Sequence, residues 1–167
     1  MAALTQKPLD GLEIHLLNPD TKILRYTELY NYANIEEVFG RGSKVIILYL
    51  IQNQNSGHWV CLFKNKKGIN FFDSYGVRPD YELEMLSNTQ RQNLNEQQDY
   101  LRYLLRGKHV TYNNITYQKD HTATCGCFVT HRLHNSNLND LEYFNIFYKN
   151  NYDPDIFVAQ YCHNLLN

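Results

Sequence analysis

The sequence lacks any segment that is long and apolar enough to cross a membrane. The longest apolar run covers residues 45–51, far short of the roughly 20 residues that a spanning helix needs. The N-terminal stretch MAALTQKPLDGLEIH has neither the charged region nor the apolar region of a secretory signal. We therefore expect neither a membrane anchor nor a signal peptide in this chain.

The sequence also lacks an excess of charge of either sign. Sixteen Lys and Arg residues stand against 17 Asp and Glu residues, which gives a formal net charge of −1. A dedicated nucleic-acid-binding protein is usually basic, so we expect no nucleic-acid partner. The apolar content of 43% at this low net charge also excludes an intrinsically disordered chain.

Cysteine is scarce, and no CxxC pair occurs among the four residues Cys61, Cys125, Cys127 and Cys162. A chain of 167 residues can bury an adequate core without cross-links, so we expect four free thiols rather than a disulfide framework. The missing CxxC pair argues against a structural zinc site. Low-complexity linkers and internal repeats are absent as well, which predicts one domain over residues 1–167.

The hydrophobic pattern predicts an α+β fold, with strands in the middle of the chain and helices around them. The run KVIILYLI is typical of a central strand buried on both faces. With the two segments that follow, it suggests an antiparallel meander. The predicted strands are 44–51, 58–64, 69–73, 109–112 and 115–118; the predicted helices are 26–39 (one helix or two short ones), 95–106, 125–134 and 155–166. Residues 8–20 are expected to be irregular, 52–57 to form a polar loop, and 65–68 to form a turn.

Two polar side chains are expected to meet at the outer ends of neighbouring strands. His58 begins one predicted strand, and Asp73 ends the next one in the string FFDSYG. A lone His is usually structural, and Asp-Ser-Tyr-Gly is good turn chemistry in its own right. If the two strands form a hairpin, however, Asp73 can accept a hydrogen bond from one imidazole nitrogen of His58. The other nitrogen is then free to act as a base.

Cys125 is the candidate nucleophile. It stands at the predicted N-terminus of an apolar helix, where the positive end of the helix dipole lowers the pKa of a thiol. Gly126 follows it and permits close approach to the backbone amides. Most free cysteines are simply small buried residues, an interpretation that suits Cys61, Cys127 and Cys162 better. Gln118, seven residues before Cys125, could supply an amide donor to an oxyanion, although a lone Gln carries no weight.

Taken together, the strings GHW, FFDSYG, YQ and CGCF resemble the Ulp1/adenain-type (clan CE) cysteine proteases. That family has His-Trp, then an acidic residue or Asn, then Gln, then Cys-Gly. Here Asp73 follows His58 by fifteen residues, and Gln118 precedes Cys125 by seven. In this seven-residue gap, and in Thr124 before the cysteine, the sequence most resembles the adenovirus-type maturation proteases of virophages, Polinton-like elements and giant DNA viruses.

The resemblance implies a central mixed or antiparallel sheet flanked by helices, with the nucleophile at the N-terminus of a buried helix. It implies that Cys125 attacks, that His58 is the base, and that Asp73 orients His58. It also implies an oxyanion hole formed by Gln118 and the Cys125 backbone amide.

Trp59 and Gly126 would contact a substrate with small, glycine-type residues beside the cleaved bond.

The resemblance further implies substrates that are capsid or virion precursor proteins, with neither metal nor cofactor. It implies a monomer that acts in the virion and in the host cytoplasm, at the virus factory. Three alternatives stay open. They are a ubiquitin- or SUMO-like isopeptidase with the same machinery, an acetyltransferase of the bacterial effector type, and a non-enzymatic virion protein.

Overall fold

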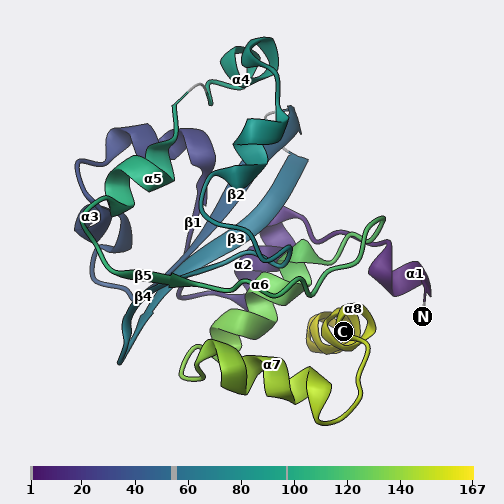
Figure 1. The fold of residues 1–167 in the computed structure, drawn as a ribbon. Coiled ribbons are helices and arrows are strands. Elements are labelled where there is room, and N and C mark those ends of the chain that lie inside the picture. The colour runs from purple at the N-terminus through teal and green to yellow at the C-terminus, as the bar shows by residue number, and fades with distance from the viewer. Residues whose placement is uncertain (1, 54–55, 97) are drawn as a thin grey trace.

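A computed structural model describes residues 2–53, 56–96 and 98–167, and its centre is a five-stranded mixed sheet (Figure 1). The strands are β1 (Lys22–Arg25), β2 (Lys44–Asn53), β3 (Ser56–Asn65), β4 (Gly68–Phe72) and β5 (Val110–Tyr112), and they lie side by side in this order. Strand β3 is antiparallel to both of its neighbours, β2 and β4. At the edges, β1 pairs parallel to β2, and β5 pairs parallel to β4. The predicted α+β fold with a mixed sheet is therefore confirmed.

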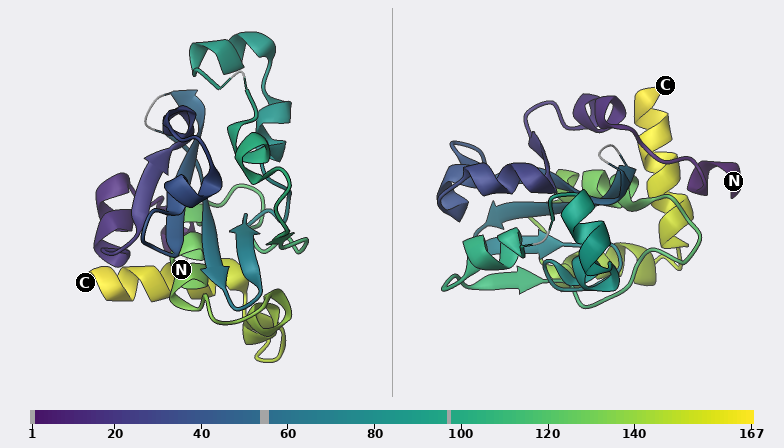
Figure 2. Two further views of the ribbon diagram at one scale, coloured as in Figure 1. Left: turned by 90° about the vertical axis from the view of Figure 1, so that its left-hand side faces the viewer. Right: turned by 90° about the horizontal axis from the view of Figure 1, so that it is seen from above.

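Helices cover both faces of the sheet (Figures 1 and 2). They are α1 (Ala2–Thr5), α2 (Gly11–Leu17), α3 (Ile35–Phe39), α4 (Asn88–Asn93), α5 (Tyr100–Leu105), α6 (Cys125–His134), α7 (Asp140–Tyr148) and α8 (Pro154–Leu166), with 3₁₀ helices η1 (Tyr26–Asn31) and η2 (Tyr81–Met85). In the views, α2, α6, α7 and α8 lie on one side of the sheet, and η1, α3 and α5 lie on the other. No helix in the described ranges is long and apolar enough to span a bilayer.

The side chains of β2 alternate between two hydrophobic cores. Ile46 and Leu48 pack with α6 and α8, whereas Val45 and Ile47 pack with η1, α3 and α5. Successive side chains of a strand point to opposite faces, so a strand between two cores must be apolar at every position. This explains the unbroken run KVIILYLI and confirms the expectation of a strand buried on both faces.

Several other predicted elements are confirmed. The meander β2–β3–β4 forms, with Asn65 and Gly68 paired across the predicted turn. The segment 26–39 is indeed two short helices, η1 and α3. Helix α6 matches 125–134, and α8 begins at Pro154 with the Asp153 side chain accepting from the backbone N–H of Ile156 at its start. The four cysteines are free thiols.

The expectation that residues 8–20 are irregular was wrong, because they contain α2. Asp10 and Glu13 form a reciprocal capping box, and each side chain accepts from the other residue's backbone N–H. The predicted strand at 115–118 is also wrong. The backbone N–H groups of Tyr117 and Gln118 both donate to Ser74 O, so this segment is tied to a turn instead of to a strand.

Several predicted boundaries shift. The helix expected at 95–106 is shorter, since α5 begins only at Tyr100, after Asn95 in the left-handed region at φ 59°. Strands β2 and β3 extend into the expected loop 52–57, of which residues 54 and 55 lie outside the described ranges.

Strand β1, helices α1, α4 and α7, and the 3₁₀ helix η2 were not predicted from the sequence.

Gly57 brings β3 against β2 just before His58. A Cβ atom at position 57 would lie 1.6 Å from Tyr49 O, so no other residue fits without moving the backbone. Tyr49 and His58 are partners in the β2–β3 register. The glycine of the string GHW therefore sets the close strand pairing from which His58 projects.

Candidate active site

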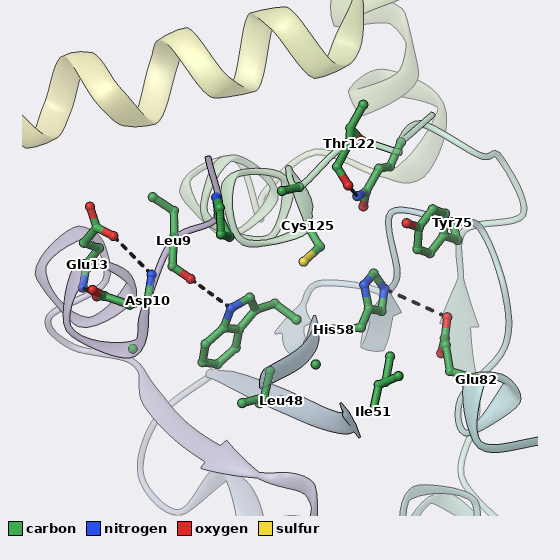
Figure 3. A pocket seen from close by; sticks show the side chains of 16 residues that line it. Leu9, Asp10, Glu13, Leu48, Ile51, His58, Tyr75, Glu82, Thr122 and Cys125 are labelled. Carbon is green, nitrogen blue, oxygen red and sulfur yellow. Dashed lines mark hydrogen bonds and ion pairs between the residues drawn. The ribbon is translucent and has the colours of Figure 1, made fainter. Parts of the chain in front are cut away.

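Three of the predicted catalytic side chains, His58, Gln118 and Cys125, line one pocket of about 500 Å³ (Figure 3). Strand β3 contributes His58, the loop before α6 contributes Gln118, and the first residue of α6 is Cys125. The fourth, Asp73, lies fully buried behind His58. The structure thus brings together all four residues that the sequence singled out.

Cys125 sits where two effects favour its thiolate. It begins a ten-residue helix, so its sulfur lies at the positive end of the helix dipole. Burial raises the pKa of the Cys125 thiol, but its hydrogen bond to His58 and the attraction of that ring outweigh burial, and the net pKa is below the ordinary value. In Figure 3 the sulfur points toward the ring of His58. This is the environment of a reactive cysteine rather than a structural one.

The ring of His58 is fixed on two sides. Its Nε2 lies 2.8 Å from Asp73 Oδ1, and the ring of Tyr75 stacks on it with centroids 4.9 Å apart. Because Asp73 engages Nε2, Nδ1 is the ring nitrogen left for the thiol. The expected pairing of His58 and Asp73 across adjacent strands is what the structure shows.

The pKa of His58 reflects a competition between burial and charge. Burial by itself lowers the pKa of the imidazole, but the negative charge of Asp73 and the interaction with Cys125 raise it, and the result lies well above the ordinary value. A raised pKa of His58 and a lowered pKa of Cys125 together favour a thiolate–imidazolium pair at neutral pH.

Asp73 is held by the turn that it begins. Its Oδ1 also accepts from the backbone N–H of Tyr75, at 2.8 Å, and its backbone groups exchange two hydrogen bonds with the Asn113 side chain. Burial raises the pKa of Asp73, but the attraction of His58 outweighs it and the net shift is downward. Asp73 is therefore a carboxylate whose direction is fixed from three sides.

Gln118 has its amide oriented by its neighbours. Ser74 Oγ donates to Gln118 Oε1 at 2.6 Å, which identifies the other end of the amide as the donor. One of its two N–H groups donates to Thr122 O at 3.1 Å. Within the described ranges the second N–H has no hydrogen-bond partner, and Gln118 lines the pocket, so this N–H is the candidate oxyanion donor.

Asp155, at the start of α8, holds the loop between Gln118 and Cys125. Its carboxylate accepts from Thr124 Oγ1 at 2.5 Å, from Thr122 Oγ1 at 3.1 Å and from the Lys119 backbone N–H at 3.0 Å. Sequence reasoning missed this residue, and no local signal sets it apart from an ordinary acidic residue in a first helical turn.

Of the two predicted substrate-binding residues, Trp59 lines the pocket and Gly126 does not. Trp59 lines the pocket and its Nε1–H donates to Leu9 O at 3.4 Å. Gly126 is buried beside the pocket, and a Cβ atom there would lie 2.9 Å from Ile14 Cδ1 and 3.3 Å from Trp59 Cδ1. Close packing of the N-terminal segment on α6 thus requires the glycine, and its contact with a substrate stays a prediction.

The remaining cysteines are buried, and none of them lines the pocket. Burial raises the pKa of Cys61, and a hydrogen bond with Cys162 together with burial raises that of Cys127. Cys162 Sγ lies 3.7 Å from Cys127 O. The geometry therefore favours Cys125 over Cys127 as the nucleophile.

Glu82 is a second acidic group at the site that the sequence did not single out. Its Oε2 lies 3.9 Å from His58 Nε2. One ligand atom from each of His58, Asp73 and Glu82 falls within 4.8 Å of the others, a spacing that a cation could also use. The 2.8 Å contact between His58 and Asp73 instead indicates a direct hydrogen bond, so we do not assign these residues as metal ligands.

No protein-family model matches the sequence. The chain is 34% identical over 125 residues to the uncharacterized protein V9 of Sputnik virophage, and the match covers 72% of this chain and 71% of V9. Among solved structures, the ASFV pS273R protease is similar with a TM-score of 0.51 and 15% identity, over 95% of this chain and 67% of that one. The Ulp1 protease domain solved with SMT3, the yeast ortholog of SUMO, is a looser match, with a TM-score of 0.37 and 13% identity over 97% and 75% of the two chains.

The likeness to pS273R establishes the fold, an α+β architecture that this chain shares with that protein. The identity with V9 establishes the family, and the chain belongs to the family of that virophage protein.

Proposed function

We propose that this protein is a cysteine endopeptidase that cleaves peptide bonds through a thioacyl-enzyme. The observation that carries the proposal is the arrangement of three side chains, in which His58 lies between Cys125 and Asp73. Cys125 lines the pocket, whereas Asp73 is fully buried. The protease fold of pS273R supports it, and so does the lowered pKa of the Cys125 thiol.

In the first step, the Cys125 thiolate attacks the carbonyl carbon of the scissile bond. The new C–S bond pushes the carbonyl π electrons onto oxygen, which becomes an oxyanion. The free N–H of Gln118 and the backbone N–H of Cys125 donate to that oxygen. Because Ser74 and Thr122 already fix the Gln118 amide, little reorganisation is needed when the charge appears.

Collapse of this intermediate breaks the C–N bond, and His58 gives its proton to the departing amine. His58 is then neutral and takes a proton from the water that attacks the thioester. The acid leaves, and the Cys125 thiolate and protonated His58 are restored. Asp73 stabilises the charged ring in both half-reactions and keeps Nε2 engaged.

The proposed substrates are capsid or virion precursor proteins, cut in the virion and in the virus factory. A virophage relative supports a viral setting. The apolar walls of the pocket include Leu9, Leu48 and Trp59, and the position beside His58 is Gly57. Such a surface suits an extended backbone with small, glycine-type residues at the cleaved bond, handled by a monomer without metal or cofactor.

The test is cleavage of candidate substrates followed by mapping of new termini by mass spectrometry. Capsid proteins encoded beside this gene are incubated with the wild type, with Cys125→Ala and with the matched control Cys127→Ala. We expect cuts at small residues with the wild type and Cys127→Ala, and none with Cys125→Ala. Cleavage by Cys125→Ala would refute the assignment. Inactivity on these proteins combined with processing of ubiquitin- or SUMO-like C-termini would favour an isopeptidase.

A further inference from the structure

Two carboxyl groups meet at the buried end of the candidate site. Asp73 is fully buried, and the Glu82 side chain is 13% exposed. Asp73 Oδ2 and Glu82 Oε1 are both buried, and neither is paired with an N–H or O–H group in the described part of the chain. Both groups lie close to Nε2 of the same ring, that of His58.

Two ionised carboxylates in this position would repel each other, and each would keep an unsatisfied oxygen. A single proton placed between them removes both costs, because a protonated carboxyl group is a hydrogen-bond donor. Asp73 is the group that faces His58 at 2.8 Å and needs its charge there, whereas Glu82 is 3.9 Å away. The proton therefore belongs on Glu82.

We propose that Glu82 is a positioning residue of the candidate site, a neutral carboxylic acid that donates a hydrogen bond to Asp73 and holds it against His58. The inference rests on the proposed function, since it gives Glu82 a part in the same thiol chemistry. Asp73 is then fixed at both oxygens, with His58 and the Tyr75 backbone N–H on Oδ1 and Glu82 on Oδ2.

The titration behaviour of the two acids agrees with this assignment. Burial and the neighbouring Asp73 together raise the pKa of Glu82 to about 9, whereas the net shift of the Asp73 pKa is downward. At neutral pH the pair thus carries one negative charge. Above about pH 9 a second charge appears beside His58, and the two carboxylates then repel each other.

Glu82 interacts electrostatically with Tyr49 of β2, His58 of β3 and Asp73 of the turn after β4, and it lines the pocket with Tyr75 of that turn and Cys125 of α6. None of them is a Lys or Arg, so His58 is the cation of this group. The negative charge that appears when Glu82 loses its proton therefore acts most strongly on the His58 ring.

The test compares the pH dependence of Cys125 alkylation in Glu82→Gln and Glu82→Leu. An amide at position 82 can still donate to Asp73, whereas Leu cannot. Without a donor the pKa of Asp73 rises, and its charge is lost at a higher pH during acidification. The thiolate–imidazolium pair depends on that charge, so the acid limb of the iodoacetamide rate should move upward by at least about half a pH unit in Glu82→Leu. Glu82→Gln should keep the wild-type acid limb.

A second measurement uses the ring resonances of His58 in NMR. The wild type should show an inflection near pH 9 as Glu82 ionises, and Glu82→Gln should lack it. Glu84→Gln is the matched control, because Glu84 lies on the same 3₁₀ helix but pairs with Arg78, and it should leave both profiles as in the wild type.

All samples contain a chelator, and Cys125→Ala corrects for alkylation of the other thiols. Profiles of Glu82→Leu that superimpose on the wild type would overturn the proposal, and so would a Glu82→Gln profile shifted as far as that of Leu. A profile that changes when the chelator is omitted would replace the proton with a metal ion and overturn it too. If Glu82→Leu does not fold, the His58 inflection and its loss in Glu82→Gln decide the matter. Alkylation needs no peptide substrate, so a wild type that cleaves nothing would refute the proposed function and leave this test intact.

Discussion

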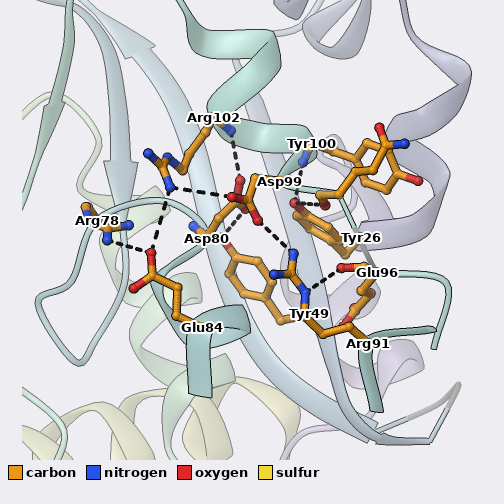
Figure 4. Close-up of polar contacts among 11 residues, drawn as sticks. Tyr26, Tyr49, Arg78, Asp80, Glu84, Arg91, Glu96, Asp99, Tyr100 and Arg102 are labelled. Carbon is orange, nitrogen blue, oxygen red and sulfur yellow. Dashed lines mark hydrogen bonds and ion pairs between the residues drawn. The ribbon is translucent and has the colours of Figure 1, made fainter. Parts of the chain in front are cut away.

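The segment from Asp73 to Met85 contributes acidic residues to two buried clusters, which differ in how fully the carboxylate oxygens are paired. In the first, Asp80 accepts from Tyr49 OH at 3.1 Å and from the Arg102 backbone N–H at 2.9 Å, while its own N–H donates to Tyr49 OH (Figure 4). Both oxygens of Asp80 have donors. This cluster joins β2, the 3₁₀ helix η2 and helix α5.

The second cluster, at the candidate site, leaves Asp73 Oδ2 and Glu82 Oε1 without an N–H or O–H donor from the rest of the described chain. The two clusters are neighbours, because Tyr49 and His58 are paired across β2 and β3. A buried polar group whose hydrogen bonds are all made stabilises a fold. A buried polar group without a hydrogen-bond partner costs stability, so it is retained for a reason other than stability. The contrast distinguishes Asp80, whose pairing supports the structure, from Asp73 and Glu82, to which we assign roles in the proposed chemistry.

The largest expected effect is on the chemical side of this comparison. His58→Ala removes both the base and the acid, and we expect a loss of about 10²–10⁴ in kcat. Asp73→Asn should lose less, because the Cys125–His58 pair forms in part without it. Steady-state kinetics on a peptide substrate measures both, with thermal unfolding to confirm that each variant folds. Equal losses would give Asp73 a larger role than orientation, and a fully active Asp73→Asn would place the third member elsewhere.

Gln118→Ala should lower kcat by about 10²–10³ with little change in KM, because its N–H meets a charge that exists only during attack. Gln118→Glu should be at least as damaging, since a carboxylate repels the oxyanion. Alkylation of Cys125 forms no oxyanion, so its rate should be nearly unchanged in Gln118→Ala. Gln92→Ala, at an exposed position of α4, is the control. A Gln118→Ala protein that alkylates as slowly as it hydrolyses would show that Gln118 shapes the thiolate instead.

Asp80→Ala tests the structural side. It leaves Tyr49 OH and the Arg102 N–H without their acceptor and puts Ala at φ 67°, so the free energy of unfolding should fall by about 2–3 kcal/mol. Asp80→Asn keeps an acceptor and tolerates the left-handed region, and should cost less. Denaturant unfolding measures the loss, and the alkylation rate of Cys125 in the folded protein should stay at the wild-type value. If Asp80→Ala kept its full stability but slowed the alkylation of Cys125, the two clusters would not have separate roles.

The smallest expected effect concerns Glu96, which is buried and lies outside the pocket. One of its carboxylate oxygens has no hydrogen-bond partner among the described residues. Its Oε1 accepts from the Leu50 backbone N–H, and burial raises its pKa from 4.5 to about 7. Between these two pH values the folded state keeps a proton that the unfolded state loses, so stability falls as the pH rises. Gln has no such proton to lose. Glu96→Gln should therefore gain in Tm relative to the wild type from pH 5 to pH 8.

Thermal unfolding at several pH values measures this gain. Glu36→Gln is the contrasting control, because Lys108 lowers the pKa of Glu36 and the sign of the pH dependence is opposite. A Tm difference that does not depend on pH would mean that Glu96 is not protonated in the folded state.

The sequence predicts the parts of the site that local signals determine. Gly57 before His58, the turn that starts at Asp73 and the Cys-Gly pair at a helix start are each readable from a few neighbouring residues. Glu82 and Asp155 could not be found in this way, because their roles arise from contacts across the fold. The same reason applies to β1, whose four residues become a strand only by pairing with β2, more than twenty positions along the chain.

The hydrogen bonds of Asp155 to the loop before Cys125 have a consequence for the protein while it is being synthesised. All the groups of the proposed reaction lie within the first 125 residues, but the carboxylate that fastens residues 119–124 is made about thirty residues later. A nascent chain that exposes the thiol, the imidazole and the amide donor still lacks that anchor until α8 emerges from the ribosome and docks. We therefore expect the growing polypeptide to stay latent on the ribosome, so that the proposed activity appears only when helix α8 has docked.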